Sequence, residues 1–467
     1  MPLSEISRHS NWTPIISPSD ILAEPAWRAA GAVVEAIFQK DYSVPSAPKQ
    51  TPSFEAPLLY LFWGLGRGEP VWIERAVDEL NCAIGDVSLW TNFLGLHGGL
   101  CGLGWVVQHV SQLLATESED NTTEQLGLDR AEDPIRDIDI YMLKMLDRPQ
   151  WQEAYDTIGG LVGYGVYFLE RLPGETAVQA LTLIVNHLAA LSEDTGEGIG
   201  WHSGPEFLAP ELREQCPDGY YNLGAAHGIA GVMYLLGELV AAGVETDKSQ
   251  ALLEGAFDWL LAHQRPSGSI SRFSSWIAPS HSFNSQLSWC YGDLGIMAVL
   301  IQVARRAGRE DWSQFAHDLL DHCLAWPINR SGVEDAGLCH GACGVAHIFN
   351  RIYHSERDPR CRDASLKWFE HAIGMWRPGT GVGGFAIPGK SNPKGDLVGE
   401  ANPGFLDGSI GVALALLAAL TPVEPQWDRL LLLSARDRTK PCAHPGQPNQ
   451  QTGNVDSLPS HIQRHAQ

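Results

Sequence analysis

The stretch Gly337–Gly344 reads GLCHGACG and ends in a Gly-x-x-Gly step. In six such steps of the chain an apolar run follows the second glycine, as in VMYLL at 232–236 and VALALL at 412–417. A helix that is apolar on all sides is buried on all sides. The sequence therefore repeats a unit in which a glycine step opens a buried helix. The six steps are Gly99–Gly102, Gly160–Gly163, Gly228–Gly231, Gly292–Gly295, Gly341–Gly344 and Gly408–Gly411.

The repeat is long enough to hold a pair of helices. Successive first glycines stand 61, 68, 64, 49 and 67 residues apart, by subtraction of their positions. Between the apolar runs lie amphipathic stretches with charge on one side, such as Glu254–His263 and Asp311–Trp326. This alternation predicts an all-α fold in which six to seven helix pairs form an inner ring inside an outer ring. We expect long irregular rims at Gly196–Asn222, Arg265–Leu287 and Arg377–Phe405.

Composition and charge exclude several classes of partner. The 467 residues carry a net charge of −23, which argues against nucleic acid or an anionic membrane surface. We expect no signal peptide and no membrane insertion. Nine cysteines without a dense spacing pattern predict a reduced, cytoplasmic protein. We divide the chain into an N-terminal segment, 1–56, with a helix near Ile21–Lys40, the repeat domain, 57–433, and a polar tail, 434–467, expected to be disordered.

The position just before each first glycine carries candidate functional residues. In a ring of inner helices this position faces the same central cavity in every repeat. It is polar or reactive in four of the six repeats, namely at His227, Tyr291, His340 and Asp407. One residue earlier stand Cys290 and Cys339, in neighbouring repeats. Two thiolates and one imidazole form a known catalytic zinc set, so Cys290, Cys339 and His340 predict one zinc site with an open fourth position.

Other residues at related positions have simpler interpretations. Cys101 and Cys343 stand before the second glycine, where the other repeats carry Val, Ala, Leu and Ile, so we interpret them as core residues. We interpret Asp407 as a helix cap and leave it out of the catalytic set. Paired carboxylates in the cavity, which a glycosidase of the α/α-barrel type would need, are not supplied by the repeat positions.

Three motifs resemble those of the lanthionine synthetase C-like family, the LanC-type cyclases. They read NLGAAHGIAG at 222–231, SWCYG at 288–292 and GLCHG at 337–341, and the resemblance covers about residues 57–433. It implies an α/α toroid and one zinc per chain, bound through Cys290, Cys339 and His340. It also implies an enzyme that adds peptide cysteine thiols to dehydroalanine or dehydrobutyrine, closing (methyl)lanthionine thioether rings in a lanthipeptide precursor, as in antibiotic biosynthesis.

The same resemblance implies roles for further residues. His227 and Asp156 match the family's acid/base histidine and aspartate, and Tyr291 matches a tyrosine beside the metal. We expect His227 to be the general acid, with Asp156 orienting its imidazole; capping of its own helix is the alternative role for Asp156. Gln286 departs from the pattern, since some members carry an arginine four residues before the first zinc cysteine.

Alternatives to the cyclase stay open at this point. One keeps the site and adds glutathione, in place of a peptide thiol, to dehydroamino acids in proteins. Another is a non-catalytic, zinc-stabilised toroid that binds peptides, which would have a closed site with four ligands and no use for His227. The partner implied by the cyclase reading is a dehydrated precursor peptide, and the resemblance leaves a dehydratase and an exporter open as further partners.

Overall fold

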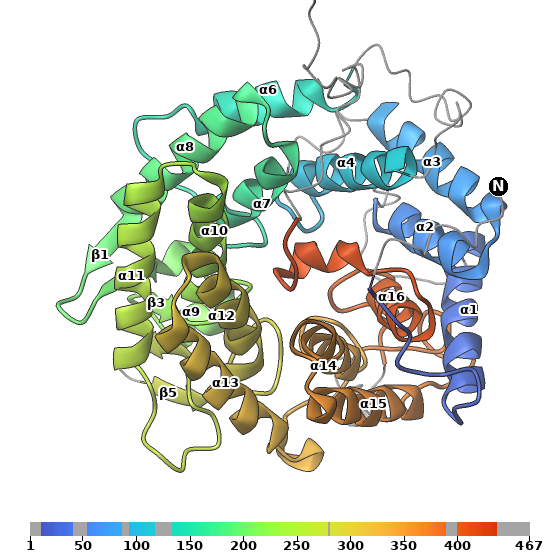
Figure 1. Ribbon diagram of the computed structural model, residues 1–467. Coiled ribbons are helices and arrows are strands. Elements are labelled where there is room, and N and C mark those ends of the chain that lie inside the picture. The colour runs from blue at the N-terminus through green and yellow to red at the C-terminus, as the bar shows by residue number, and fades with distance from the viewer. Residues whose placement is uncertain are drawn as a thin grey trace, which may run out of the picture.

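The computed structural model describes residues 11–40, 54–85, 93–116, 133–278, 281–388 and 399–436. Within them, helices form two concentric rings, so the predicted all-α toroid is confirmed (Figure 1). Seven helices line the inner ring, the upper end of the predicted six to seven pairs. They are α2 (Glu55–Arg67), α4 (Leu100–Thr116), α7 (Leu161–Arg171), α10 (Ile229–Ala242), α12 (Asp293–Ala307), α14 (Ala342–Glu356) and α16 (Ser409–Leu420).

The outer ring covers the inner one with amphipathic helices. α1 packs against α16, and every later outer helix packs against an inner neighbour, as α13 does on α12 and α15 does on α14. The predicted N-terminal helix is α1, which takes its place in this ring. The outer helices are α1 (Ala23–Gln39), α3 (Pro70–Gly85), α6 (Arg136–Leu146), α8 (Glu175–Leu191), α11 (Thr246–Ala262), α13 (Glu310–Leu324) and α15 (Pro359–Gly374). Most of the tail predicted at 434–467 lies outside the described residues.

The glycine steps have a steric explanation. Each of the six steps opens an inner helix, and its second glycine packs against the backbone carbonyl six residues earlier. A Cβ placed on these glycines would lie only 1.9–2.6 Å from that carbonyl oxygen, which is inside van der Waals contact. Glycine is therefore required wherever a loop folds back onto the first turn of its inner helix. The pairs are Gly102 and Leu96, Gly163 and Thr157, Gly231 and Ala225, Gly295 and Trp289, Gly344 and Leu338, and Gly411 and Phe405.

Two of the expected irregular rims contain a small sheet instead. Five short antiparallel strands pair in chain order, with His202 opposite Tyr221 and Asn222 opposite Trp276. The expectation was wrong there because strands of three to five residues leave no clear alternation among Gly, Pro and Ser. The strands are β1 (Ser192–Asp194), β2 (Ile199–Ser203), β3 (Tyr220–Asn222), β4 (Ser274–Ala278) and β5 (His281–Asn284), and the short helices are η3 (Pro205–Phe207), α9 (Pro210–Gln215) and η4 (Ile328–Arg330).

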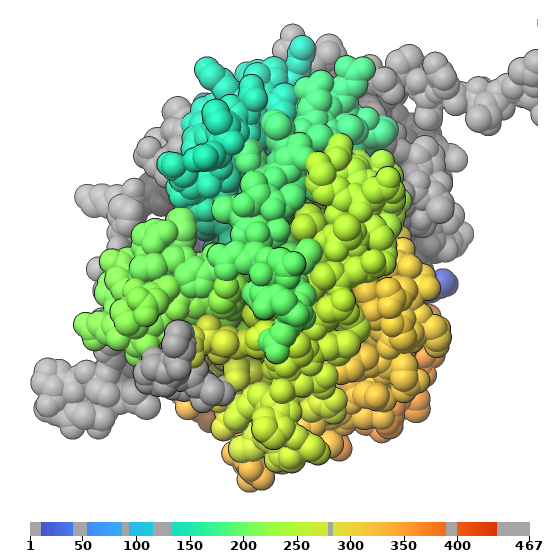
Figure 2. Space-filling model, turned by 90° about the vertical axis from the view of Figure 1, so that its left-hand side faces the viewer, coloured from blue at the N-terminus to red at the C-terminus, as the bar shows by residue number. Residues whose placement is uncertain are grey.

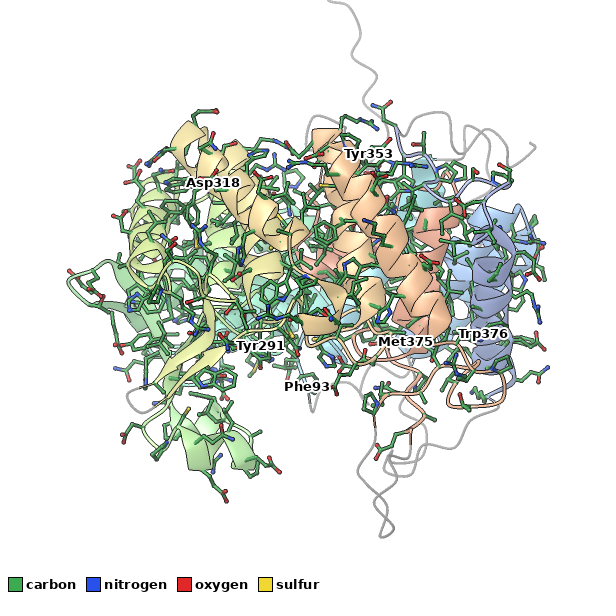
Figure 3. All side chains as sticks on the ribbon, turned by 90° about the horizontal axis from the view of Figure 1, so that it is seen from below. Phe93, Tyr291, Asp318, Tyr353, Met375 and Trp376 are labelled. Atoms are coloured by element: carbon green, nitrogen blue, oxygen red, sulfur yellow. The ribbon has the colours of Figure 1, made fainter. Side chains whose placement is uncertain are left out.

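This sheet stands out from the ring. The side view shows the segment between β1 and α10 protruding beyond the outer helices (Figure 2). Seen from below, the strands extend past the face of the ring on which Tyr291 and Phe93 lie, whereas Asp318 and Tyr353 lie at the opposite face (Figure 3). The sheet therefore borders the face that carries the loops before the inner helices. Among the described helices, none is both long and apolar enough to cross a membrane.

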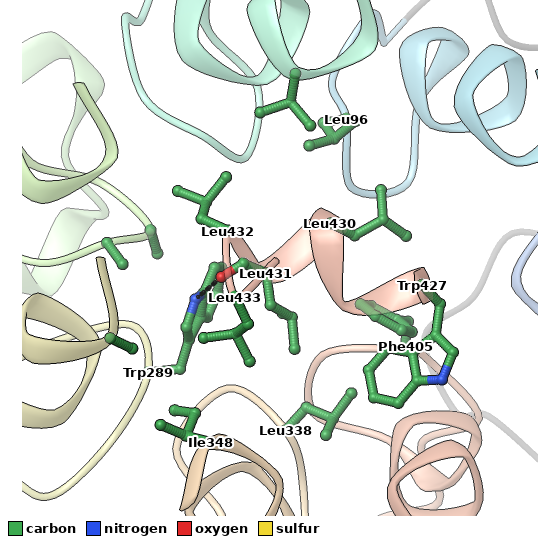
Figure 4. Packing of buried hydrophobic residues seen from close by; sticks show 14 of the residues in the cluster. Leu96, Trp289, Leu338, Ile348, Phe405, Trp427, Leu430, Leu431, Leu432 and Leu433 are labelled. Carbon is green, nitrogen blue, oxygen red and sulfur yellow. Dashed lines mark hydrogen bonds between the residues drawn. The ribbon is translucent and has the colours of Figure 1, made fainter. Parts of the chain in front are cut away.

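The C-terminal end of the described chain fills the middle of the toroid. η5 (Gln426–Leu431) and the residues after it form a central plug, 426–433, whose leucines and Trp427 are buried (Figure 4). Trp289 donates a hydrogen bond from Nε1 to the carbonyl of Leu431 over 2.6 Å, and Nε2 of His97 lies 3.1 Å from the carbonyl of Leu430. The plug thus closes the ring behind the loops that carry the candidate site.

Candidate metal centre and catalytic site

Backbone hydrogen bonds join the loops before the inner helices into a rim. In the first five repeats, the residue two before the first glycine is linked to its counterpart in the next repeat, directly or through the residue beside it. This series of bonds fixes the positions at which the sequence predicts the candidate ligands. The links run from His97 N to Ile158 O (3.2 Å), Thr157 N to Ala226 O (2.9 Å), Ala226 N to Cys290 O (3.4 Å), Cys290 N to Cys339 O (3.2 Å) and Cys339 N to Leu406 O (2.9 Å).

The rim brings Cys290 and Cys339 together. Cys290 is buried and Cys339 is half-buried, and both are free thiols. A hydrogen bond from the Cys339 thiol lowers the pKa of Cys290, against the opposing effect of burial, and the nearby charge of His340 adds to the lowering. Ser288 supports the pair, with its Oγ 3.8 Å from the Cys290 sulfur. One of the two thiols is therefore already disposed to lose its proton.

His340 completes the predicted ligand set and is oriented by a buried carboxylate. Its Nδ1 lies 3.0 Å from Oδ2 of Asp335, and this contact raises the pKa of His340 to about 9, although burial opposes it. The other oxygen of Asp335 accepts the backbone N–H of Gly337 at 2.7 Å. Because Nδ1 is held by Asp335, Nε2 is the nitrogen left to bind a metal.

Asp335 was missed by the sequence analysis, although a signal was present. The residue six before the first glycine is Asn222, Asp335 or Asn402 in three of the six repeats. Each of these side chains accepts a hydrogen bond from the backbone N–H two residues later, at 2.9, 2.7 and 2.8 Å. Such turns are a common use of Asn and Asp. Only Asp335 has a second carboxylate oxygen free to reach the imidazole.

The interpretation of Asp407 as a helix cap is wrong. Gly408 is the N-cap of α16, and no side chain caps that helix. Asp407 lies beside His340, with Oδ1 3.3 Å from Nε2. Within the described ranges, Cys339, His340 and Asp407 form a group whose ligand atoms all lie within 4.8 Å of one another. The physical reason is that the loop bond from Cys339 to Leu406 sets the two loops edge to edge, so Asp407 points at the neighbouring repeat.

These residues fit a zinc ion. Cys290 stands outside the group of three and contacts it through Cys339, so four donors border one space. Thiolates and an imidazole are the preferred donors of zinc, and a carboxylate behind the far imidazole nitrogen is the usual support of a zinc-bound histidine. The acidic neighbours Asp335 and Asp407 also favour a bound cation.

A second pair lies next to the thiols. Nδ1 of His227 is 2.6 Å from Oδ2 of Asp156, and the other Asp156 oxygen accepts the N–H of Gly159 at 2.9 Å. Burial works to lower the pKa of His227, but the hydrogen bond and charge of Asp156, with a smaller contribution from Cys290, raise it overall. The imidazole side chain is 36% exposed, so a substrate can reach it. The pair can therefore hold a proton at the rim and present it on Nε2.

Tyr291 adjoins both groups, because it follows Cys290 in the chain and stacks on His227. Its ring stacks on that of His227, with centroids 6.0 Å apart, and meets Trp276 of the sheet edge-on at the same separation. Burial raises the pKa of Tyr291 far above its usual range, so it stays a neutral hydroxyl. Gln286, the position at which the sequence departs from the resemblance, packs its side chain against Gly332.

The structure brings the predicted site residues close together. Cys290, Cys339 and His340 interact with one another, and the His227–Asp156 pair lies beside Cys290, with Tyr291 stacked on His227. Cys101 and Cys343 are fully buried among apolar side chains, as their core interpretation predicts. Whether the candidate residues carry the roles assigned to them stays a prediction.

Comparison with known proteins agrees with the fold. The chain is 24% identical over 312 residues to "Glutathione S-transferase LANCL1" of Danio rerio, which spans 65% of this chain and 69% of the relative. It is 24% identical over 224 residues to "Nisin biosynthesis protein NisC" of Lactococcus lactis subsp. lactis, spanning 44% of this chain and 51% of the relative. The solved structure of "Nisin cyclase" superposes with a TM-score of 0.66 at 17% identity, over 87% of this chain and 97% of that one.

The family assignment rests on a longer match. The profile described as "Lanthionine synthetase C-like protein" matches residues 66–432, which is most of the chain and includes every candidate site residue. The toroid with its glycine-opened inner helices and rim-bound thiols agrees with that match. The chain belongs to the lanthionine synthetase C-like family.

Proposed function

We propose that this chain is a zinc-dependent cyclase that forms thioether rings in a dehydrated peptide. The observation that carries the proposal is the juxtaposition at the rim. A pair of thiols beside an oriented imidazole lies next to a histidine–aspartate pair, and Tyr291 adjoins both. Thiol activation and proton delivery are the two tasks that addition to a dehydroamino acid requires.

Cys290, Cys339 and His340 would hold the zinc. When bound there, zinc would lower the pKa of a substrate cysteine thiol, which is otherwise about 8.5, so that the sulfur reacts as a thiolate at neutral pH. Asp335 keeps Nδ1 of His340 engaged and so presents Nε2. The neutral hydroxyl of Tyr291 and the edge of Trp276 border the space where the dehydroamino acid would lie.

His227 would supply the proton that completes the addition. The substrate sulfur forms a bond to the β-carbon, the π-electron pair moves toward the α-carbon and carbonyl, and the resulting enolate takes a proton at the α-carbon. The raised pKa of His227 favours its imidazolium form near neutral pH, and Asp156 holds Nδ1 so that Nε2 carries the transferable proton. The dehydroamino acid itself must come from a dehydrating enzyme that acts on serine or threonine.

Addition of glutathione is the second candidate, because one relative is named as a glutathione S-transferase. The same thiol site and the same proton donor would serve it, with glutathione in place of a peptide cysteine. A purely peptide-binding toroid is less well supported. It would have no use for the His227–Asp156 pair, whose 2.6 Å hydrogen bond lies beside the thiols.

A mass-spectrometric assay separates these candidates. The full chain is loaded with zinc and mixed with a peptide that holds both cysteine and dehydroalanine, with and without glutathione. Cyclisation leaves the peptide mass unchanged but protects the cysteine from N-ethylmaleimide, whereas glutathione transfer adds the mass of glutathione. We expect protection with the wild-type protein and its loss in His227→Asn. Glutathione addition without cyclisation would assign the second candidate, and no reaction on either route would refute catalysis.

A further inference from the structure

Asp407 has a carboxylate oxygen to which no described residue donates a hydrogen bond. Its Oδ1 is buried and takes part in no hydrogen bond with any residue that the structure describes. Nε2 of His340 lies 3.3 Å from this oxygen, and the Cys339 thiol interacts with the same carboxyl group. A buried carboxylate oxygen that accepts no hydrogen bond is costly unless a cation or a donor meets it.

The separation of the two atoms has a geometric meaning. A charge-assisted hydrogen bond between an imidazolium and a carboxylate is about 2.7–2.9 Å long, which is shorter than the distance seen here. Two donors bound to one tetrahedral zinc at about 2.05 Å each stand about 3.3 Å apart. Oδ1 of Asp407 and Nε2 of His340 are separated by 3.3 Å, and the Cys339 sulfur belongs to the same group within 4.8 Å. Nδ1 of His340 is already held by Asp335.

We propose that Asp407 is a resident fourth ligand of the zinc, which an incoming substrate thiol displaces. This inference rests on the proposed function, since it takes Cys290, Cys339 and His340 as the other three ligands. The resting site is then closed by a carboxylate of the chain rather than by water. On substrate binding, one contact to a carboxylate oxygen is exchanged for one to sulfur, and the thiol proton is released to the buffer.

The charge at the site favours such an exchange. Two thiolates and one carboxylate bring three negative charges to a divalent cation, and two thiolates with a substrate thiolate bring the same three. The exchange therefore leaves the net charge of the four metal ligands unchanged. The charge that the thiolate adds at the metal replaces that of the carboxylate, and Asp407, whose side chain is 42% exposed, keeps its own charge in contact with solvent. A resident ligand of this kind holds the metal between turnovers and competes with small thiols.

Two binding measurements on the full chain test the proposal. Zinc affinity is measured by competition with a chelator, and thiol binding is measured by titrating the cobalt-loaded protein with 2-mercaptoethanol and following sulfur-to-cobalt charge-transfer absorption. The variants are Asp407→Asn and Asp407→Ala. Glu334→Gln is the matched control. Glu334 is an exposed carboxylate beside Asp335, and this substitution removes the same charge as the Asp407 variants do.

The expected result is a pair of opposite changes. Both Asp407 variants weaken zinc binding by about 10- to 100-fold, the range seen when a supporting partner of a metal is lost. They also bind 2-mercaptoethanol more tightly, because the thiol no longer displaces an anionic ligand. Glu334→Gln changes neither. Weakening of both affinities, or behaviour like the control, overturns the inference while leaving the zinc site in place. A wild-type protein that binds no zinc overturns the proposed function together with the inference.

Discussion

The His227–Asp156 pair allows the sharpest prediction, through the substitution Asp156→Asn. The amide keeps the size of the carboxylate and its contact with Gly159, but it removes the charge that favours the imidazolium. Burial then acts on His227 without its main opposing effect, so the pKa of His227 falls. Since the general acid must be protonated, the alkaline limb of the rate profile moves to lower pH.

The size of the shift follows from the contact. A hydrogen bond to a charged group contributes about 1.5–3 kcal/mol, and the partial exposure of the ring reduces this to about 1.4 kcal/mol. One pH unit corresponds to about 1.4 kcal/mol, so the limb should move down by about one unit. The assay is the single-turnover rate of thioether formation by the zinc-loaded protein, measured across pH with a dehydrated peptide.

Glu153→Gln is the matched control, since Glu153 is a largely exposed carboxylate near the same loop. It should leave the profile unchanged. If Asp156→Asn lowers the rate equally at every pH, then Asp156 holds the conformation of the loop and does not raise the pKa of His227. If the rate does not change at all, the pair has no part in proton delivery, and the assignment of His227 as general acid is refuted.

Three further substitutions test the scaffold and the support of the metal site. Gly344→Ala places a Cβ 1.9 Å from a backbone carbonyl and should lower the free energy of unfolding by about 3 kcal/mol, whereas Gly374→Ala, with open space around it, should not; a denaturant titration compares them. Trp289→Phe leaves a buried plug carbonyl without its 2.6 Å hydrogen bond and should cost about 1–3 kcal/mol in the same titration. Asp335→Asn weakens the support of the imidazole and should loosen zinc by about 10- to 100-fold in chelator competition, and an unchanged affinity would remove Asp335 from the site.

Much of the fold was predictable because one backbone requirement recurs. A loop that folds back onto its helix leaves no room for a Cβ at positions such as Gly295 and Gly411. The repeated glycines therefore mark where each inner helix of the ring begins. The seventh inner helix, α2, has no preceding glycine step. The repeat alone therefore predicted six to seven helix pairs and did not decide between the two numbers. The sheet was missed because its pairing is set by the distant register between His202 and Tyr221 and between Asn222 and Trp276.

The candidate site was predictable to the extent that it follows the repeat. Cys290 and Cys339 occupy equivalent positions in neighbouring repeats, and His340 follows Cys339 directly. The rim hydrogen bonds bring these positions together. Asp407 shares the position of His340, but its role depends on which neighbour it faces, and this is a property of the folded ring. Asp335 reaches the imidazole of His340 across a turn within one loop. The recurrence of Asn or Asp at this position in three of the six repeats indicates the turn, but it does not indicate the contact with His340.

The central claim is that this rim holds one zinc through Cys290, Cys339 and His340. Metal analysis of the purified full chain, beside Cys339→Ala and the core variant Cys343→Ala, tests it most directly. We predict about one zinc per wild-type chain. We predict its loss in Cys339→Ala and its retention in Cys343→Ala, because Cys343 lies buried in the apolar core. A folded wild-type protein that contains no zinc after growth and dialysis with the metal would contradict the account.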